Sequence, residues 1–331
     1  MRQTGKILRT AGIGAVLLAF FGNTGPVMAQ QLPVWRHGVV KAKSDSGFVM
    51  MANRHGFDQK YGLKIETLEF NDGQLQVRAL ISGAVDSIES GVGEEIVAAS
   101  AGADVKIFGC SWPSPPQGVL AKIAIAVPQD LKGKTIATSA PGSFPDLLAH
   151  AILEKYGMTS SDVQFAGLGG DNDRYKALIS GVVDAAVVSS EYLPVAPKGV
   201  HLLVSARDIM PNYMRWCFAS TGKRLEERRD DAVSFMAAEI DALRYAVSHR
   251  DETVKLTREV VDSKPDDPRP EFMFDQVVDN KMIDPEISIP TDKIQWMQDL
   301  FLQTGSLRTK FDLAKMIDAD IRTKALAKIK N

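Results

Sequence analysis

Two stretches of the chain repeat the same pattern of apolar and polar positions. Residues 79–86 read Ala-Leu-Ile-Ser-Gly-Ala-Val-Asp and residues 177–184 read Ala-Leu-Ile-Ser-Gly-Val-Val-Asp, so seven of eight positions match at a spacing of 98 residues. Apolar residues recur three and four positions apart in both stretches, which predicts a helix with one buried face. Gly83 and Gly181 stand where each helix is expected to end in the left-handed conformation. Each copy therefore predicts a helix, a glycine stop, a buried strand, a turn and a second helix.

Short apolar runs alternate with amphipathic segments through the rest of the chain up to Ser220. Strands are predicted at 64–70, 85–88, 105–109, 134–138, 163–168, 183–188 and 200–205. Beyond Ser220 the periodicity is helical, at 230–248, 291–304 and 312–329. Strands that alternate with helices indicate an α/β fold with mostly parallel sheets, which bind ligands beyond the carboxyl ends of their strands. Two copies are too few for a solenoid, so the repeat predicts two similar α/β lobes. Chance similarity between two helix–strand corners is the alternative.

The first 29 residues have a pattern of their own. Arg2, Lys6 and Arg9 precede an apolar run at 11–21, and Ala29 ends a stretch with small residues. A basic start, a short apolar core and a small-residue cleavage site are typical of a secretory signal peptide, whereas a membrane-spanning helix needs about 20 apolar residues. We therefore expect residues 1–29 to be a signal peptide whose removal leaves 302 residues. A buried N-terminal helix is the alternative. No cysteine lies near the cleavage point, so we expect no lipid anchor. No later stretch is long and apolar enough to span a membrane, so we expect a periplasmic protein that does not itself span it.

Composition narrows the classes of function. Of the 331 residues 45% are hydrophobic, which supports a sizeable core and excludes a disordered chain. The net charge of −2 argues against a nucleic-acid partner. Two cysteines, Cys110 and Cys217, exclude a disulfide-dense scaffold and a cysteine-based zinc module, and the sequence leaves open whether they pair. The five histidines lack a ligand spacing, and no nucleophile elbow or phosphate loop occurs, so we expect no metal, no cofactor and no catalytic residue.

Four motifs after the apolar leader occur in an order that resembles a known family. They are Gly-Phe-x₃-Tyr-Gly-Leu at 56–63, the two repeated stretches, and Asp-Leu-Lys-Gly-Lys-Thr at 130–135. Together they resemble the periplasmic substrate-binding proteins for nitrate, sulfonates, taurine and thiamine-pyrimidine precursors, which serve ABC uptake transporters. The resemblance covers residues 34–329 and does not specify a ligand.

This resemblance implies a two-lobed periplasmic-binding-protein fold of type II. Each lobe would hold one mostly parallel, doubly wound sheet, and a two-stranded hinge would join the lobes, with the chain crossing between them twice. On this sequence, lobe I would hold residues 30–125 and 214–331, and lobe II residues 126–213.

Candidate ligand-binding residues lie in the loops at the expected strand ends. Small residues let backbone N–H groups approach a ligand, and helix N-termini offer unpaired donors with a partial positive charge. The candidates in lobe I are Ser44, Asp45, Ser46, Gly73, Gln74, Gly91, Val92 and Trp112. The candidates in lobe II are Ser139, Gly142, Ser143, Phe144, Asp171, Asn172, Ser189, Glu191 and Tyr192, and Trp216 is the candidate at the returning crossing.

Each group of candidates has a second interpretation. Ser143 stands where a helix cap is expected, so its side chain either caps the helix or meets a ligand. Arg174 either pairs with an anion or is solvated. The loop acids either stabilise helix N-termini or meet an amine or ring N–H on the ligand, and they count against a small inorganic anion such as nitrate: Asp45, Glu94, Asp171, Asp173 and Glu191. The aromatic residues either wall a planar ligand or pack at the hinge: Trp112, Tyr192, Tyr213 and Trp216.

These observations predict an exported, monomeric solute-binding protein that delivers a small organic molecule to an ABC permease and its ATPase. The ligand is expected to be a sulfonate, an amine-bearing compound or a planar heterocyclic or aromatic compound. A periplasmic enzyme that uses an acid such as Glu94 or Glu191 is one alternative. A ligand-sensing subunit that docks on a membrane receptor is another.

Overall fold

The structure is a computed structural model that describes Met1, Gly5 and residues 31–330. Residue contacts separate residues 1–31 from residues 32–331, and the fold described below belongs to the second part. The expected signal peptide at 1–29 lies outside the described residues apart from Met1 and Gly5.

Two five-stranded sheets form the framework of residues 32–330. Their strand orders are β2-β1-β3-β10-β4 and β7-β6-β8-β5-β9. In each sheet only one of the described strands, β10 or β5, runs antiparallel to its neighbours. The two orders have the same topology, which confirms the prediction of two similar α/β units with mostly parallel sheets. The strands are β1 Val34–Val40, β2 Lys64–Phe70, β3 Ser87–Ser90, β4 Lys106–Trp112, β5 Gln117–Lys122, β6 Thr135–Thr138, β7 Gln164–Gly167, β8 Ala185–Ser189, β9 Val200–Ser205 and β10 Trp216–Ser220.

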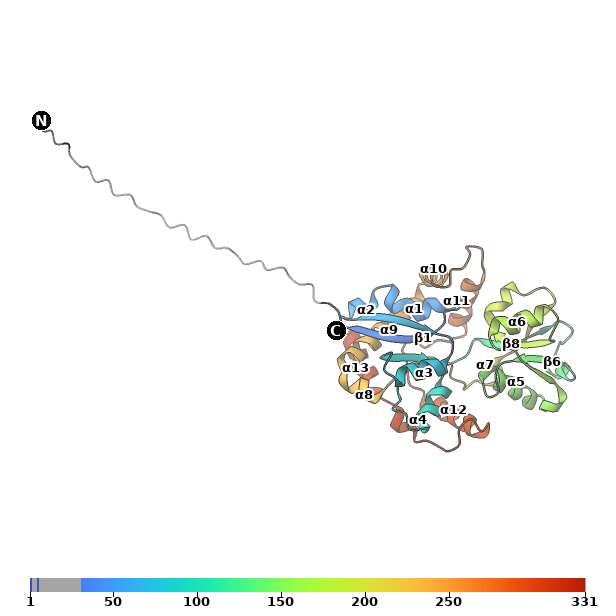
Figure 1. Ribbon diagram of the computed structural model, residues 1–331. Coiled ribbons are helices and arrows are strands. Elements are labelled where there is room, and N and C mark those ends of the chain that lie inside the picture. The colour runs from blue at the N-terminus through green and yellow to red at the C-terminus, as the bar shows by residue number, and fades with distance from the viewer. Residues whose placement is uncertain (2–4, 6–30, 331) are drawn as a thin grey trace. The chain divides into compact units, whose positions relative to one another are not determined.

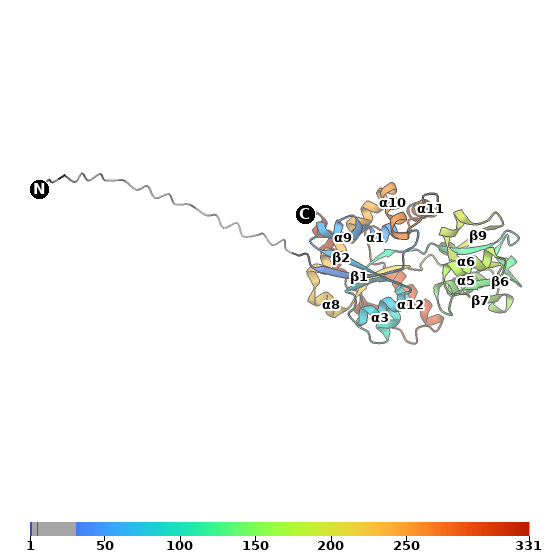
Figure 2. The same cartoon turned by 45° about the horizontal axis from the view of Figure 1, so that its top comes forward.

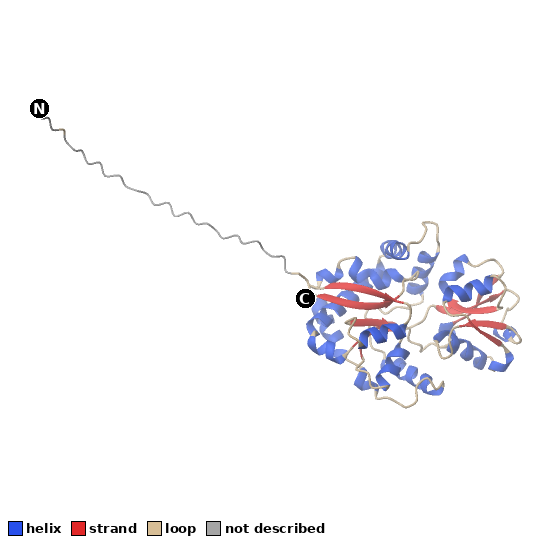
Figure 3. Cartoon of the chain, viewed as in Figure 1, coloured by secondary structure: helices blue, strands red, loops and turns tan. Residues whose placement is uncertain are grey.

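Helices surround both sheets (Figure 3). We call each sheet with its helices a lobe, the first lobe holding β1 and the second holding β6. In Figures 1 and 2 the green segment with α5, α6 and β6 lies apart from the blue and orange segments of the first lobe. The first part of the chain carries α1 Ser46–Arg54, α2 Phe57–Lys60, α3 Gly73–Ile81 and α4 Val92–Ser100. The second lobe carries α5 Phe144–Lys155, α6 Asp171–Ile179, η3 Ser190–Val195 and α7 Ala206–Ile209. The last part carries α8 Gly222–Glu227, α9 Arg229–Ser248, α10 Arg250–Val261, α11 Arg269–Asp279, α12 Thr291–Gln303, η4 Leu313–Met316 and α13 Ala319–Lys330.

The repeated motif forms the same local structure in both lobes. In the first copy α3 ends before Gly83 (φ 76°), and in the second α6 ends before Gly181 (φ 82°). Both glycines adopt the left-handed conformation that the sequence predicts. Buried strands β3 and β8 follow. The copies diverge after these strands, since β3 leads into the α-helix α4 and β8 into the short 3₁₀-helix η3.

The aspartate that ends each motif explains why the motif recurs. Asp86 accepts hydrogen bonds from the backbone N–H (2.8 Å) and the guanidinium of Arg36. Asp184 accepts hydrogen bonds from the Thr135 backbone N–H (3.0 Å) and the Lys122 ammonium group. Each aspartate thus ties the start of one strand to its neighbour, so the motif has a structural role in each sheet.

The final helix begins later than the sequence predicts. The pattern indicates a helix from residue 312, but α13 begins at Ala319 after the short η4. Ile317 bridges to Ile107 of β4, and the Asp318 N–H donates to the Ile107 carbonyl. This extended contact at the sheet edge interrupts the helix.

The first crossing between the lobes is also earlier than predicted. The sequence places it after residue 125, yet β5 already pairs with β8 and β9 in the second sheet. The chain therefore crosses between Trp112 and Gln117, and it returns between Ile209, the end of α7, and Trp216. The two crossings lie side by side, because the Arg215 N–H donates to the Trp112 carbonyl (2.9 Å).

A disulfide joins Cys110 of β4 to Cys217 of β10, a pairing that the sequence leaves open. Both strands belong to the first sheet, and the disulfide lies where one strand leaves for the second lobe and the other returns. It closes a loop with a sequence separation of 107 residues, which contains the whole second sheet.

Candidate functional site

Two cavities lie between the lobes, each lined by residues from both. The larger, of about 1000 Å³, is lined mainly by charged and polar residues, and we call it the charged cavity. The smaller, of about 660 Å³, has several apolar and aromatic lining residues, and we call it the apolar-walled cavity. The charged cavity is lined from 40–44, 170–172, 191–195 and 261–269, together with Asn71. The apolar-walled cavity is lined by residues 140–144 and by Gln74, Val77, Arg78, Gly91, Gly93, Glu94, Val97, Ala98, Ala101, Pro115, Gln117, Tyr213, Arg215, Phe301 and Ser306.

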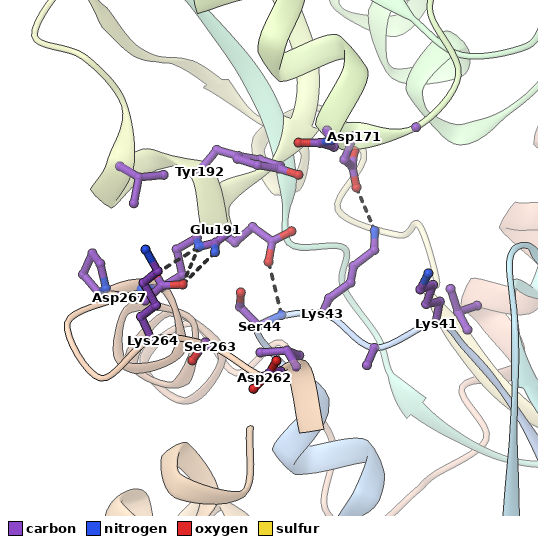
Figure 4. Close-up of a pocket in the computed structure, with 18 of the residues that line it drawn as sticks. Lys41, Lys43, Ser44, Asp171, Glu191, Tyr192, Asp262, Ser263, Lys264 and Asp267 are labelled. Carbon is purple, nitrogen blue, oxygen red and sulfur yellow. Dashed lines mark hydrogen bonds and ion pairs between the residues drawn. The ribbon is translucent and has the colours of Figure 1, made fainter. Parts of the chain in front are cut away.

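Two polar contacts in the charged cavity join the lobes (Figure 4). The Lys43 ammonium lies 2.7 Å from the Asp171 carboxylate, and the Ser44 backbone N–H donates to Glu191 at 3.2 Å. Lys43 and Ser44 follow β1 in the first lobe, whereas Asp171 begins α6 and Glu191 lies in η3 of the second lobe. Burial alone would lower the pKa of Lys43 and raise that of Asp171, but the opposite charges reverse both shifts.

Arg174 is buried behind this cavity. Its guanidinium donates to the Val187 carbonyl (2.6 Å), to the Gly169 carbonyl and to Asp171. Burial lowers the pKa of Arg174, and the Asp171 charge opposes that shift. Arg174 therefore holds the N-terminal turn of α6, is buried and lines neither cavity.

Arg215 lies at the returning crossing and was missed by the sequence reasoning. Its guanidinium pairs with Asp45 (2.6 Å) and stacks 3.6 Å from the ring centroid of Trp216 and 4.5 Å from that of Trp112. Only 6% of Arg215 is exposed, yet it lines the apolar-walled cavity. In the sequence, the signal for Arg215 is a positive charge next to Trp216, a candidate residue at the predicted hinge. The sequence could not show that Asp45, 170 positions away, is its partner.

A buried carboxyl group lies close to this arginine. Glu89 of β3 is 4% exposed and accepts a hydrogen bond from the Ser111 hydroxyl. Burial raises the pKa of Glu89 to about 7, although the Ser111 hydrogen bond and the Arg215 charge oppose the shift. Glu89 is therefore a titratable group beside the Arg215–Asp45 pair.

The apolar-walled cavity is bounded by aromatic rings at the start of α5. The rings of Phe144 and Tyr213 lie 4.3 Å apart, and Phe301 also lines the cavity. Ser143 occupies the cap position of α5, but its side chain makes no cap hydrogen bond. The Ser143 hydroxyl and the Gln117 amide oxygen are both enclosed without a hydrogen-bond partner among the described residues. Because enclosed polar atoms are normally hydrogen-bonded, these two unpaired atoms are exceptions to that rule beside the cavity.

Glu94, in the first turn of α4, also lines the apolar-walled cavity. Its carboxylate packs so closely against Gly91 that a Cβ at that position would lie 2.2 Å from Oε2. Burial raises the pKa of Glu94, and the charge of Asp72 raises it further.

The sequence-predicted candidates fall into four groups. The charged cavity is lined by Ser44, Asp171, Asn172, Glu191 and Tyr192. The apolar-walled cavity is lined by Gln74, Gly91, Gly142, Ser143 and Phe144. Three surround Arg215, namely Asp45, Trp112 and Trp216. Those three line neither cavity, and nor do the remaining five, namely Ser46, Gly73, Val92, Ser139 and Ser189.

Two features are absent from the described part of the chain. No cluster of histidine, cysteine, aspartate or glutamate side chains there could hold a metal ion. No helix there has both the length and the apolar character needed to cross a membrane.

The sequence pattern of the family described as NMT1/THI5-like matches residues 43–253, which include both copies of the repeat and most residues of the apolar-walled cavity. The chain belongs to this family. The match confirms the resemblance that the order of motifs indicates.

Individual relatives agree with this assignment. A protein of Brucella abortus (strain 2308) described as a binding protein is 31% identical over 150 residues, which is 45% of this chain and 46% of that relative, so the match spans about half its length. A protein of Bacillus subtilis (strain 168) described as an aliphatic-sulfonate-binding protein is 27% identical over 81% of this chain and 80% of its own length. The structure of the periplasmic aliphatic sulphonate binding protein of Escherichia coli matches with a TM-score of 0.72 and 23% identity, over 87% of this chain and 92% of that one. This NMT1/THI5-like chain therefore has the periplasmic-binding-protein fold.

Proposed function

We propose that the protein is an extracytoplasmic solute-binding protein that captures a small organic molecule between its lobes and delivers it to an ABC import permease. The observation that carries the proposal is the pair of cavities lined by residues of both lobes. A molecule bound between two lobes stabilises the arrangement in which both contact it, so its binding shifts the population toward closure. The names of the Brucella, Bacillus and Escherichia relatives support binding rather than turnover.

We propose the apolar-walled cavity as the principal ligand site. Ligand sites for small organic molecules commonly have volumes of about 300–1,000 Å³, mostly apolar walls and a few polar groups. The cavity of about 660 Å³ fits this description, with polar groups at Ser143, Gln117 and Arg215. In this proposal the charged cavity, with Lys43 and Asp171, controls how the lobes meet.

In this proposal the two lobes move relative to each other, and the bounds of each lobe follow its sheet. The first would consist of residues 32–112 and 216–330, and the second of residues 117–209. The ligand class that fits the walls is a sulfonate, an amine-bearing compound or a planar aromatic compound, as the sequence predicts. Apolar and aromatic walls favour such molecules over an inorganic anion. Delivery to the periplasm by residues 1–29, a monomeric state and the absence of catalysis belong to the same proposal.

A thermal-shift screen tests this proposal first. Purified protein without residues 1–29 would be screened against sulfonates, amines, pyrimidines and aromatic acids. Ligands that bind the folded state raise the melting temperature in proportion to their concentration and affinity. We expect at least one class to do so, with one molecule bound per chain and recovered unchanged. Chemical conversion of a bound compound would support an enzyme instead, and no shift with any class would contradict the proposal.

A further inference from the structure

A buried cation lies close to two buried acids where the chain returns from the second lobe. Arg215, Asp45 and Glu89 are all buried. The Arg215 guanidinium pairs with Asp45 at 2.6 Å, and both of these charges also act on Glu89. Within the described part of the chain, Arg215 is the one cation that affects the pKa of Glu89. Ionisation of both acids would therefore leave this cluster with a net negative charge, and a buried charge without a partner is costly.

The other titratable groups around Glu89 do not compensate for that charge. Glu95 of α4 and Glu239 of α9 also interact with Glu89, and burial raises the pKa of both well above the usual range, so we expect each to keep its proton. On the neighbouring strand β1, burial lowers the pKa of His37 to about 3, so this ring is neutral at higher pH. The Ser111 hydroxyl of β4 donates a hydrogen bond to Glu89 but has no charge.

Asp45 connects the cluster to the contacts that join the lobes. It directly follows Lys43 and Ser44, which contact the second lobe across the charged cavity. Arg215 belongs to the returning crossing and donates its backbone N–H to the Trp112 carbonyl at the start of the outgoing one. The Arg215–Asp45 pair thus holds the two crossings to the loop of the first lobe that reaches the second.

We infer, on the basis of the proposed closure of the lobes, that Glu89 is a proton-controlled positioning residue for closure. While Glu89 is protonated, Arg215 is attracted to Asp45 alone. When Glu89 releases its proton to solvent, its carboxylate attracts Arg215 and repels Asp45. The loop with Lys43 and Ser44 is then held less firmly, and the equilibrium shifts toward the open arrangement.

The separation of the lobes at two pH values tests this inference without a ligand. Asn71 and Asn172 are exposed and border the charged cavity from opposite lobes. Nitroxide labels at Asn71→Cys and Asn172→Cys, in the mature chain with its disulfide intact, report their separation by electron spin resonance. Because burial raises the pKa of Glu89 to about 7, its ionised fraction rises from about one tenth at pH 6 to about nine tenths at pH 8. We expect the population with the shorter separation to fall at least about threefold over this range.

Two variants in the labelled chain assign the pH response to this cluster. Glu89→Gln keeps an oxygen that can accept from Ser111 and cannot ionise, so the separation should be the same at both pH values. Asp45→Asn removes the charge that holds Arg215, so the longer separation should dominate at both pH values. The matched control is Glu95→Gln, since Glu95 is an equally buried acid of the first lobe and should leave the native pH response unchanged.

An unchanged separation between pH 6 and pH 8 in the labelled chain would overturn the inference. The same pH response in Glu89→Gln would also overturn it, because another group would then be responsible. If a compound found in the thermal-shift screen shortens the separation but pH does not change it, the inference fails and the proposed function stands. If neither a compound nor pH changes the separation, both fail.

Discussion

At the scale of single residues, the cleft is organised around buried charges that compensate one another. Asp45 pairs with Arg215, and Asp171 pairs with Lys43, so these two acids do not confront a ligand as free negative charges. Because they are paired, Asp45 and Asp171 repel an anionic ligand less than the sequence suggests. Glu89 differs, because its principal contact is the Ser111 hydroxyl and burial raises its pKa to about 7.

The raised pKa of Glu89 predicts a pH dependence of stability. The folded chain retains a proton that the unfolded chain releases between pH 4.5 and about 7. Glu89 therefore contributes most to the free energy of unfolding at low pH, and this contribution is lost as the pH rises through this window. Compared with Glu89→Gln, the native chain should lose roughly 2–3 kcal/mol between pH 5 and pH 8. Urea unfolding at both pH values measures the difference, and parallel pH profiles for the two proteins would contradict it.

A single substitution at Ser143 tests whether the apolar-walled cavity is the ligand site. In Ser143→Trp an indole would occupy the space beside Phe144, while the half-buried position at the start of α5 leaves the core of the second lobe intact. We expect the affinity for the screened ligand to fall by more than about tenfold with an unchanged circular-dichroism spectrum. The control is Ser161→Trp at an exposed position of the same lobe. Normal affinity in Ser143→Trp would remove Ser143 from the site.

At the scale of elements, hydrogen bonds join the two crossings to each other and to α12. Lys293 near the start of α12 donates to the carbonyls of Pro113 (3.0 Å) and Pro211 (3.2 Å), one in each crossing. The disulfide joins β4 and β10 at the base of the same crossings. In the proposed closure, these contacts would confine movement between the lobes to short segments of backbone.

Removing the disulfide should therefore affect stability more than binding. Its loop of sequence separation 107 restricts the unfolded chain, so Cys110→Ala combined with Cys217→Ala should lower the free energy of unfolding by about 4–5 kcal/mol. Both cysteines are buried in the first sheet and line neither cavity. Ligand affinity at a temperature where the variant is folded should stay within about twofold of the native value. Loss of affinity with unchanged stability would show that the disulfide acts on the site instead.

The elements differ in how far the sequence predicts them. The repeated helix–glycine–strand units are predictable, because the periodicity of α3 and α6 and the two glycines are local signals. The strand β5 is missed, because its short apolar run gains its partners, β8 and β9, only from segments far along the chain. Several cavity loops are predicted by their positions after strands, but the helix connection at 261–269, which also lines the charged cavity, is not. The pairing of Arg215 with Asp45 is a long-range contact that no local pattern encodes.

At the scale of the whole molecule, contacts across the charged cavity already join the lobes. The Lys43–Asp171 ion pair and the Ser44–Glu191 hydrogen bond connect the end of β1 with α6 and η3. Contacts between α11 and η3 add to this interface, where the Ser190 hydroxyl lies 3.6 Å from the Met273 sulfur. Polar contacts that form only when the lobes meet shift the equilibrium toward the closed arrangement.

Weakening one of these contacts should shift the equilibrium in the opposite direction. Lys43→Met removes the ion pair and leaves Asp171 bound to Arg174. A partly buried pair contributes about 1 kcal/mol, so we expect the ligand to bind roughly fivefold more weakly, chiefly through faster dissociation. The control is Lys41→Met, since Lys41 borders the same cavity at an exposed position. Stopped-flow measurement of dissociation compares the variants, and equal rates would contradict a role for Lys43 in closure.

The central claim is that the lobes close on a ligand held in the apolar-walled cavity. Small-angle X-ray scattering of the mature chain, with and without the ligand found by thermal shift, tests it directly. The account predicts a smaller radius of gyration with ligand for the native chain and no change for Ser143→Trp at the same ligand concentration. Tight stoichiometric binding with an unchanged radius of gyration in the native chain would contradict the claim.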